Sequence, residues 1–140
     1  MTAKQRLTLT RDVHAPSQAR SWVSAQLPHV PADAADDALL IASELVTNAL
    51  RHGKPEIVLA LDLHTDRLRI EVHDAGDELP AMPEPLPESV HTGGRGLLIV
   101  AATASDWGVV RVDGRPGKTV WAQVLFGLQP QPVEAAPESD

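Results

Sequence analysis

The sequence predicts an α/β fold of one domain, built from apolar helices and from strands that alternate apolar and polar residues. Two observations lead to this prediction. Residues 35–53 carry apolar side chains around most of the circumference of a helix, which is typical of a helix buried in a core. Residues 67–74 alternate strictly, with Leu68, Ile70 and Val72 on one side, as in a strand with one buried face.

The first third of the chain is predicted to hold one strand and two helices. Residues 6–10 alternate over a short length and predict a strand at the edge of a sheet. A helix opened by Pro16 runs to about Gln26, where further prolines end it. The central helix follows and ends at Gly53, with aspartates near its start and basic residues in its last turn, as the helix dipole favours.

The remainder predicts a hairpin, a lid, a short helix and two further strands. The hairpin pairs residues 56–63 with residues 67–74 in antiparallel fashion. The proline-rich segment 77–92 has no periodicity, and a stretch of this kind inside a domain is typical of a mobile lid. The other segments are a glycine-rich loop over 93–96, a helix over 97–102, strands over 107–112 and 119–126, and a disordered tail over 129–140. We therefore expect a domain over residues 1–128.

Composition limits the function. The chain has 140 residues, a net charge of -7 and no cysteine. Its length is enough for a single hydrophobic core, and the lack of thiols excludes disulfides, cysteine zinc sites and thiolate nucleophiles. The acidic balance argues against direct binding of nucleic acid. No apolar run reaches the length of a membrane span and no signal core follows the first methionine, so we expect a cytoplasmic protein with no membrane partner.

Polar side chains on the central helix and at the end of the strand 67–74 need partners if they are buried. Glu44, Thr47, Asn48 and Arg51 have the spacing of one stripe on the central helix. The alternative is that this stripe is the solvated edge of an amphipathic helix. Asp74 continues the alternation of the third strand and so points to its buried face, where a carboxylate is costly unless it binds something. The alternative is that the strand ends one residue earlier and Asp74 is a turn aspartate.

Glycines mark further candidate binding positions. Gly76 allows a ligand to approach the backbone closely. The loop 93–96 opens a helix and offers free N–H groups to an anion, with Arg95 adding charge; the alternative is a flexible hinge. The segment 117–119, Gly-Lys-Thr, looks like the end of a phosphate-binding P-loop. It lacks the required earlier glycine and precedes a predicted strand rather than a helix, so we reject it.

Together these features resemble the GHKL ATPase superfamily of gyrase-type topoisomerases, heat-shock chaperones, mismatch-repair ATPases and sensor histidine kinases. The resemblance covers roughly residues 15–126. Within it, the segment Glu44-Leu-Val-Thr-Asn-Ala-Leu-Arg-His-Gly53 looks most like the small anti-sigma-factor serine kinases of bacteria. The resemblance implies a Bergerat-type two-layer sandwich. A mixed, mostly antiparallel sheet is covered on one face by three helices, and ATP lies between the layers.

The resemblance also implies ATP and Mg2+ as ligands and assigns roles to residues. Asn48 would coordinate Mg2+. Glu44 would be the general base that takes a proton from a serine hydroxyl in a kinase, or from water in an ATPase. Asp74 would accept a hydrogen bond from the adenine amino group, with Gly76 under the purine. The other nucleotide-binding residues that the resemblance implies are His52, Gly94, Arg95, Gly96, Leu97 and Thr119.

Two positions depart from the pattern of this superfamily. Glu78 stands where a second glycine is common, which predicts a stiffer first hinge of the lid. The threonine of the last strand commonly follows a glycine directly, whereas here Lys118 separates Gly117 from Thr119. Strand alternation then puts Thr119 on the face opposite Val120, away from the predicted pocket.

These observations lead to one main hypothesis and two alternatives. The main hypothesis is an ATP-dependent serine/threonine protein kinase that binds a sigma factor and phosphorylates a small antagonist of the anti-anti-sigma type. The first alternative is a non-catalytic module of the same fold that uses nucleotide to control a protein partner. The second is an α/β domain that binds no nucleotide. Trp121 and Leu125 share the outer face of the last strand, where they would suit a protein partner or a homodimer.

Overall fold

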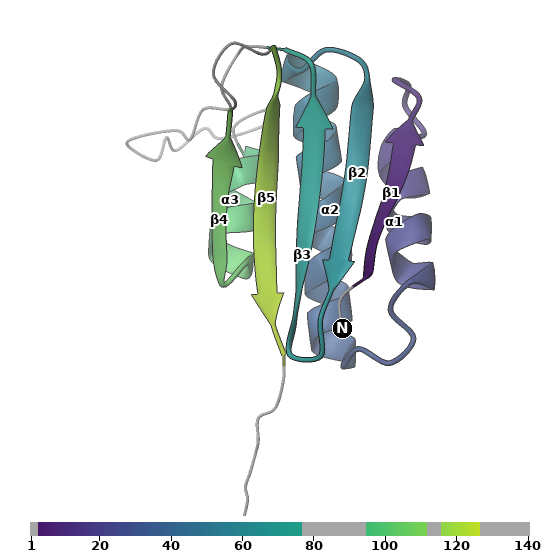
Figure 1. Ribbon diagram of the computed structural model, residues 1–140, viewed down its shortest axis with the longest axis vertical. Coiled ribbons are helices and arrows are strands. Elements are labelled where there is room, and N and C mark those ends of the chain that lie inside the picture. The colour runs from purple at the N-terminus through teal and green to yellow at the C-terminus, as the bar shows by residue number, and fades with distance from the viewer. Residues whose placement is uncertain (1–2, 77–94, 112–115, 127–140) are drawn as a thin grey trace, which may run out of the picture.

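The computed structural model describes residues 3–76, 95–111 and 116–126 of the chain. The predicted lid over 77–92, Gly94, Glu78 and the predicted tail over 129–140 lie outside these residues. The described elements run in the order β1, α1, α2, β2, β3, α3, β4, β5. They form the predicted two-layer α/β sandwich, with a sheet in one layer and helices in the other (Figure 1).

The five described strands form one antiparallel sheet in the order β1-β2-β3-β5-β4. The strands are β1 (Ala3–Leu9), β2 (Ile57–Leu63), β3 (Arg67–Asp74), β4 (Asp106–Val110) and β5 (Lys118–Leu125). β1 lies at an edge, as predicted, and β2 and β3 form the predicted hairpin. The superfamily resemblance implies a mixed, mostly antiparallel sheet. Every pairing among the described strands is antiparallel. β4, the next strand after β3 in this sequence of elements, lies two positions from β3 in the sheet. β5 lies between them and is antiparallel to both, so β3 and β4 run in the same direction.

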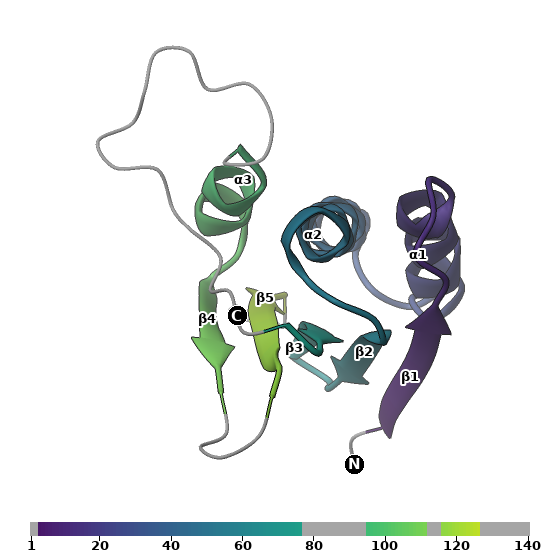
Figure 2. The same ribbon diagram turned by 90° about the horizontal axis from the view of Figure 1, so that it is seen from above.

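The three helices of the described residues cover one face of this sheet, as Figure 2 shows from above. They are α1 (Ala15–Ala25), α2 (Ala32–His52) and α3 (Arg95–Thr103). α2 begins at Ala32, three residues before its predicted start at residue 35. Pro31 occupies the N-cap, and its missing N–H breaks no hydrogen bond there because the N–H groups at the start of a helix have no partner within it. β3 agrees with its prediction at both ends, since strict alternation runs through its whole length.

The core lies between α2 and the sheet. Ile41 and Leu45 of α2 are buried against side chains such as Leu59, Ile70 and Val72 of the central strands. Each fully buried side chain of this size contributes roughly 1.5–3 kcal/mol relative to an exposed one. This core fixes α2 across the middle of the sheet, and so fixes the C-terminal end of α2 relative to the end of β3.

The other face of the sheet carries a polar group, the open-face cluster, made of Lys4, Arg69, Glu71 and Trp121. The Glu71 carboxylate accepts a hydrogen bond from Arg69 Nε at 2.8 Å and forms an ion pair with Lys4 Nζ at 3.0 Å. The Arg69 guanidinium lies 4.2 Å from the centre of the Trp121 ring, a cation–π contact. Trp121 is therefore partly covered by its own neighbours, whereas Leu125 is 59% exposed.

Within the three described ranges, no helix combines the length and the hydropathy that a membrane crossing requires.

Candidate functional site

Asp74 is the last residue of β3 and faces the helices, as strand alternation predicts. The turn-aspartate alternative is wrong, because β3 runs through Asp74 and pairs there with Lys118 of β5. The Asp74 side chain is only 2% exposed. A charge at this depth persists only with hydrogen-bonding or ionic partners, so its contacts define the site.

Within the described residues, three groups donate to the Asp74 carboxylate. Oδ1 accepts the backbone N–H of Gly76 at 2.7 Å and that of Lys54 at 3.3 Å. The Lys118 ammonium lies 3.0 Å from Oδ2 and 3.1 Å from Oδ1, and its side chain is also 2% exposed. Asp74 and Lys118 therefore form a buried ion pair in which the lysine contacts both carboxylate oxygens.

Three glycines, which we call the glycine cradle, leave space for Asp74. A Cβ on Gly53 would lie 2.4 Å from Asp74 Cγ, and one on Gly76 would lie 3.1 Å from Oδ1. Gly117 has a φ of 100° and sits so close that its Cβ would be 2.6 Å from the Asp74 carbonyl oxygen. Its positive φ is one that glycine adopts without steric cost. Only glycine fits at Gly53 and Gly117 without displacing Asp74.

Two parts of this arrangement were not predicted from the sequence. The sequence indicates Gly53 only as the end of a helix and Lys118 only as a departure from the superfamily's pattern. A signal for Lys118 was present, because Lys118 has the same parity as the buried residues Val120 and Ala122. A lysine often extends its ammonium to solvent along an apolar stem, so this signal could not predict an ion pair.

Thr119 lies on the opposite face of β5, as the alternation predicts. Its hydroxyl is 3.1 Å from His73 Nδ1, next to the open face of the sheet. The structure thus brings Lys118, rather than Thr119, to the face of β5 that Asp74 shares.

α2 brings its polar stripe toward the same region. Gly53 ends the helix by donating its N–H to the Ala49 carbonyl at 2.8 Å, directly beside the Asp74 carboxylate. Asn48 is buried, and its side chain makes no hydrogen bond to another residue that the structure describes. Glu44, one turn earlier, and His52, the last helical residue, are half-buried. Asp74 therefore lies at the C-terminal end of a stripe that contains Asn48 and Glu44.

The spacing of this stripe follows from helix geometry. At 1.5 Å per residue, Asn48 lies about 7.5 Å and Glu44 about 13.5 Å along the helix axis from Gly53. A carboxylate, an amide and a second carboxylate thus follow one another over a length comparable to that of an extended nucleoside triphosphate.

α3 begins at Arg95, so Arg95 and Gly96 belong to its first turn rather than to a loop. Leu97 is buried in the hydrophobic core, which anchors the start of this helix against α2. The first backbone N–H groups of a helix have no partner within it and can bind an anion. Gly94, the remaining predicted member of this loop, lies outside the described residues.

The donor set suits a nucleotide with its own metal better than a protein-bound metal. Among residues 3–76, 95–111 and 116–126, no three His, Cys, Asp or Glu side chains gather as a metal site. Mg2+ can be held by one or two protein oxygens when phosphate and water oxygens complete its shell. The amide oxygen of Asn48, a buried residue near the end of α2, fits that requirement.

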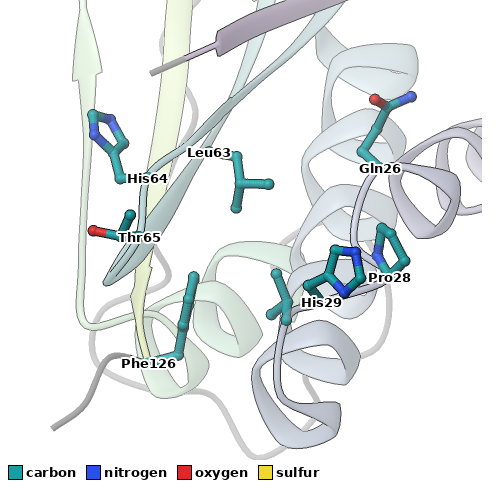
Figure 3. A pocket seen from close by; sticks show the side chains of 8 residues that line it. Gln26, Pro28, His29, Leu63, His64, Thr65 and Phe126 are labelled. Atoms are coloured by element: carbon teal, nitrogen blue, oxygen red, sulfur yellow. The ribbon is translucent and has the colours of Figure 1, made fainter. Parts of the chain in front are cut away.

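A separate cavity lies at the other end of the sheet (Figure 3). It has a volume of about 330 Å³ and is lined mainly by apolar groups that include Pro28, Leu63 and Phe126. It adjoins the turn between β2 and β3, so the length of β3, about 23 Å from Arg67 to Asp74, separates it from Asp74. It is not the predicted site.

The fold agrees with a comparison against protein families. A family model described as the histidine kinase-like ATPase domain matches residues 9–124, which is most of the chain and includes Glu44, Asn48 and Asp74. The chain belongs to this family. As a histidine kinase-like ATPase domain, it is an ATP-binding domain of the GHKL type.

The fold is also found in a solved structure, and a second structure matches more weakly. The RsbU and RsbW domains of Rv1364c from Mycobacterium tuberculosis match with a TM-score of 0.67 and 20% identity, over 99% of this chain and 35% of that chain. A histidine kinase domain of a blue-light-activated kinase from Erythrobacter litoralis matches with a TM-score of 0.49 and 22% identity, over 80% of this chain and 59% of that one. The ATPase domain thus spans about a third of the first of these chains. No curated protein sequence matches this chain.

Proposed function

We propose that this ATPase domain binds ATP with Mg2+ between its two layers and acts as a serine/threonine protein kinase of the anti-sigma type. The observation that carries the proposal is Asp74, the buried carboxylate that ends β3 in the glycine cradle, beside the C-terminal end of α2. The superfamily resemblance gives this carboxylate the role of accepting a hydrogen bond from the adenine amino group. Membership of an ATPase family makes adenine the expected base.

The spacing along α2 supports an extended nucleotide. With the base at Asp74, the phosphates would reach Asn48, about 7.5 Å along the axis from Gly53, and the terminal phosphate would approach Glu44. Mg2+ would lower the charge of the phosphates, and the Asn48 amide oxygen would hold it. The start of α3, with Arg95, Gly96 and Leu97, would face the phosphates together with Gly94, and His52 would line the site.

Glu44 is proposed as the general base. Its carboxylate would take the proton of a serine hydroxyl as the hydroxyl oxygen bonds to the γ-phosphorus, while the bond to the leaving ADP oxygen breaks. Glu44 is half-buried, so a partner's side chain can reach it from outside. The resemblance of the segment 44–53 to anti-sigma kinases suggests the partners: a sigma factor and a small antagonist protein, in the cytoplasm.

A non-catalytic, nucleotide-gated module is the second candidate. The observation behind it is the buried ion pair between Lys118 and Asp74, which puts a lysine on the proposed base-binding carboxylate and so departs from the superfamily's pattern. In that case ATP would change the binding of a protein partner without phosphoryl transfer.

Calorimetric titration of ATP with Mg2+ tests the binding site. We expect saturable binding by the wild type, loss of binding in Asp74→Asn, and loss of its metal dependence in Asn48→Ala. Asp62→Asn is the matched control, since Asp62 is an aspartate on β2, away from α2. A folded wild type that binds no ATP would contradict the proposal.

The variant Glu44→Gln separates the two candidates. A kinase should bind ATP normally in this variant and lose transfer of the γ-phosphoryl group to its antagonist protein, measured with labelled ATP. The exposed Glu56→Gln is the control. If control of the partner survives in Glu44→Gln, the non-catalytic candidate is correct.

A further inference from the structure

The Asp74 carboxylate has few hydrogen-bonding positions left for a ligand. A carboxylate offers about four acceptor positions on its two oxygens. Oδ1 accepts the N–H groups of Gly76 and Lys54 and also lies 3.1 Å from the Lys118 ammonium. The same ammonium donates its hydrogen bond to Oδ1 and lies 3.0 Å from Oδ2 as an ion-pair partner. With these contacts of the described residues counted, one position on Oδ2 remains, and it lies beside a positively charged donor.

We infer that Lys118 determines base selectivity, because its ammonium occupies the Asp74 carboxylate that a 6-amino group of a purine must reach. This inference rests on the proposed function and adds a specificity-determining residue to it. Adenine nucleotides bind only by displacing or sharing the Lys118 contact, whereas 6-oxopurine nucleotides bind without breaking it.

The chemistry of the two bases explains the difference. A 6-amino group is a donor, and the Lys118 ammonium is a donor too, so the two compete for the same oxygens. Hydrogen bonds between charged groups are roughly twice as strong as neutral ones, so a neutral amino group is the weaker competitor. Adenine therefore gains less from Asp74 than it would from a free carboxylate.

A 6-oxopurine presents the opposite pattern. Its carbonyl oxygen can accept from Lys118 while its N1–H donates to Asp74 Oδ2, and the ion pair stays intact. Without the lysine, the same carbonyl would face a bare carboxylate, which repels it. Lys118 thus reduces the preference for adenine in two ways. It weakens the binding of the 6-amino base, and it donates a hydrogen bond to the carbonyl oxygen of the 6-oxo base.

The test is titration of ATP and of inosine triphosphate, each with Mg2+, into the wild type and Lys118→Thr. These nucleotides differ only at position 6 and the adjoining N1 of the purine. We expect the wild type to bind both within roughly threefold of each other, and Lys118→Thr to bind ATP about tenfold more tightly, with the ratio of affinities shifted toward ATP by tenfold or more.

Lys54→Met is the matched control for charge. The Lys54 side chain is exposed and only its backbone N–H contacts Asp74, so this variant removes one positive charge nearby without freeing the carboxylate. We expect its ratio of ATP to inosine triphosphate affinity to equal that of the wild type. An equal shift in Lys54→Met and Lys118→Thr would overturn the inference.

A second variant covers the case in which Lys118→Thr does not fold. Lys118→Gln removes the charge but retains an N–H donor, on a side chain one bond shorter, for the buried carboxylate. We expect it to fold, as checked by thermal unfolding, and to shift the ratio toward ATP by less than Lys118→Thr.

The outcomes distinguish this inference from the proposed function. If the wild type binds ATP and the folded Lys118 variants bind it no more tightly, the inference is wrong and the proposed function stands. A strong preference of the wild type for ATP also overturns the inference alone. If neither the wild type nor the folded variants bind either nucleotide, the proposed function fails, and the inference fails with it.

Discussion

Two lysine–carboxylate pairs lie on opposite faces of β3, and their closest N–O distances are both 3.0 Å. Lys118 contacts Asp74 on the helix-covered face, where both side chains are 2% exposed. Lys4 contacts Glu71 in the open-face cluster, where the two side chains are 35% and 17% exposed. The pairs share a strand and a distance, and they differ in their contact with water.

This difference decides what each pair does. Water screens the exposed pair, whose contribution to stability is therefore small. The buried pair has lost its hydration, and an apolar pair of similar volume would stabilise the core equally well or better. Stability alone therefore does not explain the buried pair, and its position at the end of α2 favours a function in binding.

The largest expected effect comes from breaking the buried pair. Asp74→Ala leaves Lys118 charged without its partner, and we expect the free energy of unfolding to fall by about 3–5 kcal/mol. Glu71→Ala, the matched change on the open face, should cost less than about 1 kcal/mol. Denaturation in urea measures both. Equal costs would show that the two environments do not differ in the way the exposures indicate.

A smaller effect is expected from adding a methyl group beside each face. In Gly53→Ala the new Cβ meets the Asp74 carboxylate at 2.4 Å, so we expect a loss of about 1–3 kcal/mol and weaker ATP binding. In Gly108→Ala the new Cβ meets the Trp121 ring at 3.0 Å on the open face. Trp121 is half-buried on the open face rather than part of the core, so the loss should be smaller and ATP binding should not change. Thermal unfolding and ATP titration of both variants test this contrast.

The stability contributions of the two ion pairs should also differ in their dependence on salt concentration. We expect the cost of Glu71→Gln, at most about 1 kcal/mol at low ionic strength, to approach zero in about 1 M salt, where screening acts within about 3 Å. The cost of Asp74→Ala should change little, because salt does not enter a buried site. Denaturation at the two salt concentrations measures the difference, and an equal salt dependence would contradict it.

The smallest effect is expected at a fully exposed carboxylate, Asp12, which precedes α1. The backbone N–H of His14, with help from the Thr10 hydroxyl, lowers the pKa of Asp12 below its ordinary value. A lowered pKa means that the stabilisation is complete above the ordinary pKa of aspartate and is lost as the pH falls through the folded-state pKa. Asp12→Asn should therefore be slightly less stable than the wild type at neutral pH and equal to it in acid. An NMR titration of the Asp12 carboxyl group checks the direction of the shift.

The sequence determined much of this structure because its signals are local. Alternation fixed both ends of β3 and turned Asp74 inward, since consecutive strand residues point to opposite faces. The apolar circumference of α2 required burial, and the spacing of Glu44 and Asn48 placed them on one stripe. These features were enough to suggest the superfamily that the comparison with family models then showed.

Only the tertiary structure decided what surrounds Asp74. Lys118 is 44 residues away in sequence, and it reaches the carboxylate because β5 inserts between β3 and β4 and pairs with β3. Gly53 belongs to the site because α2 packs so that its end meets the end of β3. Local periodicity carries no information on which distant strand becomes a neighbour. The chain topology therefore determines that Asp74 forms an ion pair instead of remaining a free carboxylate. The base selectivity that we infer for this site depends on that ion pair.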